Sequence, residues 1–96
     1  MKPFAAISAV VYLAAIAQGA NVKICKQPNL KDCKTVTVHD NACYGFNEKV
    51  SSLDTNGAQC TFWTKKQCDG QSWKARGKHE TIPGDFNNKL SSVKCH

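Results

Sequence analysis

The sequence predicts an all-β domain, a sandwich of two Greek-key motifs cross-linked by disulfides. Three observations support this prediction: short segments of alternating polarity, a duplicated motif, and six cysteines in a chain of 96 residues. The alternation indicates strands, the duplication indicates two similar units, and the cysteines indicate covalent cross-links.

Short segments that alternate between apolar and polar residues dominate the chain after residue 20. "NVKIC" and "KTVTVHD" alternate with the period of two that half-buried strands show, and "QCTFWTK" is rich in β-branched and aromatic residues. Turn-forming sequences separate such segments: "QPNLKD", "DTNGAQ", "CDGQ" and "IPGDFNN". No segment after residue 20 keeps a helical apolar stripe through three turns, so we expect a domain that is almost entirely β.

A seven-residue motif occurs twice, as "FNEKVSS" from Phe46 and "FNNKLSS" from Phe86. Five of the seven positions are identical. The apolar positions are also kept, because Val50 corresponds to Leu90, and Leu53, directly after the first copy, corresponds to Val93. Internal similarity of this kind indicates one supersecondary unit used twice. Four short strands with a long return form a Greek key, and two such units can bury their inner faces against each other as a sandwich. The sequence places the first unit at about 22–55 and the second at about 58–95.

Residues 1–19 have the features of a secretory signal peptide. Lys2 precedes an apolar run from Phe4 to about Ala17, and small residues follow it. We expect cleavage after Gly19, which would leave residues 20–96 as the mature domain. A membrane anchor is the alternative, but the run is shorter than the ~20 residues that a spanning helix needs. The expected location is therefore extracellular, with no transmembrane segment.

All six cysteines lie in the predicted mature domain: Cys25, Cys33, Cys43, Cys60, Cys68 and Cys95. An even number of cysteines in a short secreted chain indicates a disulfide framework. Zinc is disfavoured because no C-x-x-C and no paired histidine spacing is present. A domain this small also needs cross-links, because its core supplies only ~3–5 kcal/mol.

The formal net charge is +6. Such an excess favours anionic partners, and the basic run after Trp73 is the densest in the chain. We expect a surface-binding face made of Trp73, Lys74, Arg76 and Lys78, with Trp73 more exposed than Trp63. The predicted partner is a target-cell surface, through anionic lipid, glycan or protein. We expect a monomer and no nucleic-acid partner, because no nucleic-acid motif is present.

Two short patterns carry a resemblance to a known family. "WTKKQCDG" from Trp63 matches an aromatic, four residues, a second aromatic or apolar residue, one residue and Gly, with Cys68 in the second aromatic place. "NNKLSS" from Asn87 matches Asn/Asp-Asn/Asp-x-x-Ser/Thr-Ser, and "NEKVSS" from Asn47 matches it with Glu48 in the second place. From about residue 22 to 95, the chain resembles the βγ-crystallin family. The cysteine layout resembles small secreted fungal proteins of this fold, including killer-toxin-like relatives.

The resemblance implies a candidate calcium site in each repeated loop. Its ligands would be side-chain oxygens of Glu48 and Asn88, carbonyls of Lys49 and Lys89, and hydroxyls of Ser51 and Ser91. Calcium prefers six to eight oxygens, but this chain has Lys26 and Lys65 in hairpin loops where the family often has acids. We expect no required cofactor, with calcium as an optional ligand. Asn and Ser in these loops can instead shape the turn. The resemblance also favours the pair Cys60–Cys95, with Cys25–Cys33 and Cys43–Cys68 as the others.

We do not expect an enzyme. His39, His79 and His96 are present, but no strained nucleophile turn accompanies them. The cysteines are expected to be oxidised and therefore not nucleophilic. The predicted function is that of an effector-like or antimicrobial, toxin-like secreted protein that binds a target-cell surface. The alternatives are a calcium-binding extracellular structural module and a secreted protease inhibitor, whose exposed loop would be 75–85.

Overall fold

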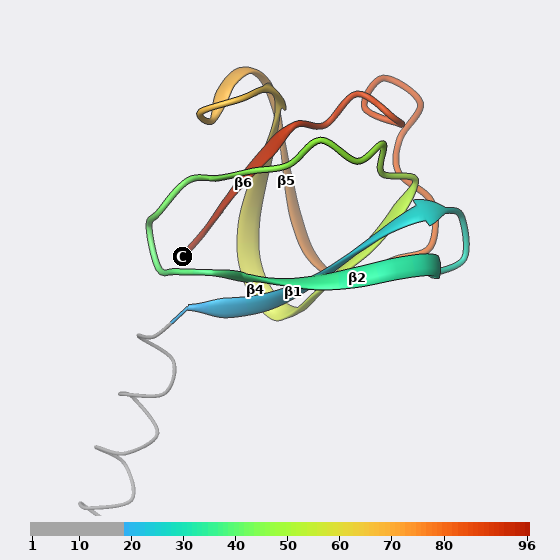
Figure 1. Cartoon of the computed structure of the whole chain (residues 1–96), viewed down its shortest axis with the longest axis horizontal. Coiled ribbons are helices and arrows are strands. Elements are labelled where there is room, and N and C mark those ends of the chain that lie inside the picture. The colour runs from blue at the N-terminus through green and yellow to red at the C-terminus, as the bar shows by residue number, and fades with distance from the viewer. Residues whose placement is uncertain (1–18) are drawn as a thin grey trace, which may run out of the picture.

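The computed structural model describes residues 19–96, which form six β-strands (Figure 1). The predicted signal peptide lies outside the described residues, apart from Gly19. Residues 19–96 contain no helix that could cross a membrane. The prediction of an all-β domain is confirmed. The strands are β1 Ala20–Gln27, β2 Lys31–Val38, β3 Tyr44–Gly45, β4 Ser52–Lys65, β5 Asp69–His79 and β6 Ser92–Cys95.

Every strand pairing is antiparallel, and the long strand β4 joins the two halves of the molecule. β1 pairs with β2 on one side and with the start of β4 on the other. The second part of β4 lies between β5 and β6, and β3 pairs with the far edge of β6. In Figure 1, β1 and β2 run across the lower half while β4 and β5 rise away from them. Because β3 precedes β4 in sequence but pairs with β6, the two predicted units interlock.

The bend in β4 lies at Asn56 and Gly57. The pairing with β5 shifts there, from Asp54 opposite Lys78 to Gln59 opposite Arg76. Asn56 and Gly57 have φ values of 56° and 88°, which Asn and Gly tolerate better than other residues. We predicted that "DTNGAQ" is a turn between strands, but it is a bulge within one strand. The Thr55 side chain makes this possible, because it donates to the Ala58 carbonyl (2.7 Å) and accepts the Gly77 N–H (2.6 Å).

A single hydrophobic core lies between the two halves of the curled sheet. The alternate side chains of each strand point into it, as the period of two predicts. Phe62, Leu53 and Val93 at its centre have no exposed surface. The other members are Val22, Ile24, Val36, Val38, Phe46, Val50, Cys60, Ala75, Ile82, Leu90 and Cys95.

Three disulfides cross-link this small core. Cys25–Cys33 joins residues that face each other in the β1–β2 hairpin, and Cys60–Cys95 joins residues that face each other on β4 and β6. Cys43–Cys68 connects the segment before β3 to the turn between β4 and β5. These are the pairs that the resemblance favoured, and no cysteine in residues 19–96 is free. Three disulfides in so small a domain are consistent with an oxidising, extracellular environment.

Candidate functional site: the repeated loops and the basic outer face

The last serine of each repeated motif is buried and holds a hairpin turn against the sheet. The Ser52 hydroxyl donates to the Gln27 carbonyl (2.6 Å) and accepts the Leu30 N–H (2.9 Å). The Ser92 hydroxyl repeats this arrangement with the Lys65 carbonyl (2.6 Å) and the Cys68 N–H (2.9 Å). Both serines are fully buried. The duplicated motif therefore has a structural role, because each copy satisfies backbone groups of one folded hairpin.

The two repeated loops also contact each other. The Ser51 hydroxyl donates to the side-chain oxygen of Asn88 (3.0 Å), and the Asn88 N–H donates to the Val50 carbonyl (3.0 Å). Asn88 has a φ of 61°, a left-handed conformation that Asn adopts more easily than most residues. Two of the predicted calcium ligands thus bond to each other across the loops.

Glu48, which is the only acidic residue in the two loops, is paired with a lysine. Its Oε2 lies 2.6 Å from the Lys34 ammonium on β2. This hydrogen bond is the main reason that the pKa of Glu48 lies below its ordinary value, and nearby backbone N–H groups lower it further. The same contact raises the pKa of Lys34. The other oxygen, Oε1, is buried without a hydrogen-bond partner.

These ligands fit calcium poorly. The shallow hollow beside Glu48 is lined by Lys26, Asn47, Lys49 and Asn88, so two basic residues border it. Like charges of this kind weaken cation binding. Residues 19–96 contain no group of three His, Cys, Asp or Glu side chains that could hold a metal. The predicted ligand side chains of Glu48, Ser51 and Asn88 are instead engaged in the ion pair and hydrogen bonds described above.

The predicted binding face is divided by the alternation of β5. Trp73 points to the core side. Its ring centroid lies 6.0 Å from that of Phe62, 5.1 Å from that of His79 and 6.2 Å from that of Phe86. Lys74 and Arg76 take the alternate positions and are exposed. Grouping Trp73 with these cations was therefore wrong, because adjacent residues of a strand face opposite sides.

Trp63, and not Trp73, lies on the outer side of the sheet. Trp63 is half-buried on the outer side of β4, opposite Ser72 of β5. The partly buried apolar residues that pack against the core in the described part of the chain include Trp73 but not Trp63. The outward-facing aromatic residue near Lys74 is thus Trp63.

The three predicted cations have different neighbours. Lys78 stands opposite Asp54, whereas Lys74 stands opposite Thr61. Between them the chain passes Gly77, whose φ of 81° accompanies the shift in strand register. Arg76 donates from Nε to the Gly57 carbonyl (3.2 Å), so its guanidinium supports the bulge of β4.

The segment after Trp73 is more regular than we expected. β5 continues to His79, so only residues 80–91 form a long connection. Ile82 is buried, and the Glu80 carbonyl accepts the Asn29 N–H (2.8 Å). The stretch 75–85 is therefore half strand, which leaves 80–85 as the part of the predicted inhibitor loop outside the strand.

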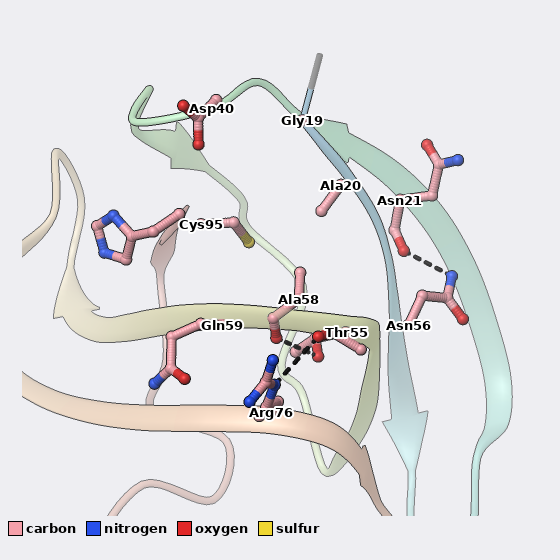
Figure 2. A pocket seen from close by; sticks show the side chains of 12 residues that line it. Gly19, Ala20, Asn21, Asp40, Thr55, Asn56, Ala58, Gln59, Arg76 and Cys95 are labelled. Carbon is pink, nitrogen blue, oxygen red and sulfur yellow. Dashed lines mark hydrogen bonds between the residues drawn. The ribbon is translucent and has the colours of Figure 1, made fainter. Parts of the chain in front are cut away.

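A half-open hollow of about 520 Å³ lies between the start of β1, the bulge of β4, Arg76 of β5 and the end of β6 (Figure 2). Arg76 and Gln59 line one side and Asp40 lines the other. Asn56 closes a further edge by donating to the Asn21 carbonyl (2.7 Å). Sequence reasoning missed this hollow because distant segments build it. Its charged groups are of both signs, and Arg76 is already hydrogen-bonded, so it does not select one class of ligand.

His79 and His96 make different contacts. His79 packs edge-on against Trp73 and contacts the Arg76 carbonyl through Nε2 (3.2 Å). His96 contacts the Asn41 side chain through Nδ1 (2.9 Å). Two of the three imidazoles are thus held in separate structural contacts.

Solved structures with this arrangement of strands are βγ-crystallin domains. The match to one from Flavobacterium johnsoniae has a TM-score of 0.67 at 20% identity. It covers 78% of this chain and 92% of the Flavobacterium chain. One from Ciona intestinalis has a TM-score of 0.62 at 22% identity, with coverages of 79% and 99%. The N-terminal domain of protein S has a TM-score of 0.64 at 18% identity, with coverages of 80% and 96%.

The chain has the βγ-crystallin fold. No family model and no curated protein matches the sequence. At these identities the likeness concerns the fold, and function has to be argued from the side chains.

Proposed function

We propose that this protein is secreted and binds the anionic surface of a target cell, as an effector-like or antimicrobial, toxin-like protein. The observation that carries the proposal is the excess of unpaired cations on a rigid domain. Residues 19–96 contain all the Lys and Arg residues except Lys2. One ion pair, Lys34–Glu48, occurs among these residues.

The position of these cations supports a binding role. Apart from the partly buried Lys94, every Lys and Arg of the described residues is exposed. A disulfide-linked β-domain loses little conformational entropy when it binds, so rigid surface charges are efficient. Unpaired charges also accelerate encounter with a surface of opposite sign. The cysteine layout that resembles killer-toxin-like proteins supports the same function.

The alternative function, a calcium-stabilised structural module, requires calcium to raise the melting temperature, because a ligand that binds only the folded state stabilises it. We expect instead that excess calcium leaves the melting temperature nearly unchanged. The physical reason is that Glu48 is paired with Lys34 and Asn88 is bonded to Ser51. Differential scanning calorimetry with calcium or with a chelator checks this. A rise of several degrees at micromolar calcium would favour the structural module.

The proposal is tested by comparing a charge-reversed variant with a variant of the repeated loops. Lys74→Glu with Arg76→Glu should reduce binding to target cells by at least about tenfold, because each cation near an anionic surface contributes roughly 1 kcal/mol. Ser51→Ala with Ser91→Ala should change binding less than about twofold. Both variants are compared with the wild type by fluorescence binding to intact cells, after circular dichroism shows that each is folded. Equal binding by the charge-reversed variant would reject the proposal.

A protease inhibitor is less well supported. An inhibitor needs an exposed, rigid loop, but only residues 80–85 of the predicted loop lie outside β5, and Ile82 among them is buried in the core.

A further inference from the structure

The outer face of the second half of the sheet carries two lysines with no acidic residue between them. In the strand register, Thr61 on β4 faces Lys74 on β5 and also faces Lys94 on β6. The three residues form one row across three strands, and their side chains share the outer side. The backbones of the two lysines are about 10 Å apart, which is twice the strand spacing.

A row of charged residues through the first part of β4 is balanced. There, Asp54 on β4 faces Lys23 on β1 and also faces Lys78 on β5. A carboxylate stands between two cations in this row, whereas a neutral hydroxyl occupies the central place in the other. The row of Lys74, Thr61 and Lys94 retains a double positive charge.

An aromatic ring adjoins the unbalanced row. Trp63 lies two residues after Thr61 on the same side of β4, and its cross-strand neighbours are Ser72 and Ser92. The ring is half-buried and does not belong to the set packed against the core of residues 19–96. Thr61 in the centre of the row is only 8% exposed.

We infer that Trp63, Lys74 and Lys94 form a binding site for an acidic polysaccharide, an inference that rests on the proposed function. The two ammonium groups would pair with carboxylates or sulfates along the polymer, and the indole would pack against the C–H face of a sugar ring. The acids of the β4–β5 register are Asp69, opposite Lys65 at the end of the hairpin, and Asp54, opposite Lys78, and neither lies in this row. No acidic residue of the register therefore opposes an anionic polymer at this row.

The polarity of this face favours a polysaccharide over a lipid bilayer. Membrane insertion requires a contiguous apolar surface beside the charges. Here, Thr61 and Ser92 beside Trp63 are buried, the exposed cross-strand neighbour is Ser72, and the ring itself is half-buried. The exposed surroundings of the ring are thus polar and lack the contiguous apolar surface that insertion into a bilayer needs.

The inference is tested by calorimetric titration with polygalacturonate, using two variants that lose equal charge. Lys74→Gln with Lys94→Gln should weaken binding at least about tenfold, whereas Lys23→Gln with Lys78→Gln should weaken it less than about threefold. Trp63 emission, followed in a Trp73→Phe background, should shift on binding and become protected from acrylamide. Thermal melts establish that each variant is folded before it is titrated.

The outcomes separate this inference from the proposed function. Equal losses of affinity in the two double variants, with no change in Trp63 emission, would overturn the site. They would indicate binding through positive charge spread over the whole surface. Binding to phosphatidylserine vesicles but not to polygalacturonate or heparin would overturn the polysaccharide as ligand. An absence of binding to cells, vesicles and both polymers would reject the proposed function as well.

Discussion

Replacing Cys60 and Cys95 by alanine is expected to lower the free energy of unfolding by about 2–5 kcal/mol. The disulfide joins residues that are 35 apart in sequence and connects the central strand to β6. Both cysteines are nearly fully buried in the core. A core of this size supplies only ~3–5 kcal/mol, so the variant should be largely unfolded at 37 °C. Guanidinium denaturation followed by circular dichroism measures the change.

The hairpin disulfide provides a matched comparison. Cys25 and Cys33 are 8 residues apart, and a shorter loop restricts the unfolded chain less, so replacing this pair should cost about 1 kcal/mol less. If removal of Cys60–Cys95 left stability unchanged, the disulfide framework would not be what stabilises this domain.

Ser92→Ala is expected to cost about 2–4 kcal/mol. The change leaves the Lys65 carbonyl and the Cys68 N–H without their partner under the folded hairpin, and each unsatisfied buried group costs ~1–3 kcal/mol. Ser52→Ala should behave alike, because Ser52 makes the same two contacts with the other hairpin. Chemical denaturation of each variant gives the free energy of unfolding.

Ser51→Ala is the control for these variants. Its hydroxyl donates one hydrogen bond to the exposed Asn88 side chain, which water can replace, so the expected cost is about 1 kcal/mol or less. A larger effect for Ser51 than for Ser52 would contradict the structural role given to the last serine of the motif.

The fold was predictable because the sequence repeats the features that form it. The duplicated motif ends in Ser52 and Ser92, and these serines fix equivalent hairpins in the two halves. The resemblance built on that motif favoured the observed disulfide pairs. Local alternation also predicted β1 and β2 correctly, because burial of Val22 and Ile24 on one face of the sheet specifies the register of the pair.

The binding face was less predictable, because it depends on strand register rather than on local sequence. Trp73 and Lys74 are neighbours in sequence but face opposite sides of β5. Lys94 joins Lys74 only through the pairing of both strands with Thr61. The bulges at Asn56 and Gly77 change which residues face each other, and alternation alone does not locate them. The pairing of Lys34 with Glu48 likewise joins β2 to a loop 14 residues away.

The dependence of cell binding on salt tests the central claim most directly. Wild-type protein is titrated against target cells at ionic strengths between about 0.05 and 0.5 M. Over this range the electrostatic screening length falls from about 14 to about 4 Å. Binding through exposed cations predicts a loss of affinity of at least about tenfold across this range, with no requirement for calcium. Affinity that is independent of salt, or that appears only when calcium is added, would contradict the account.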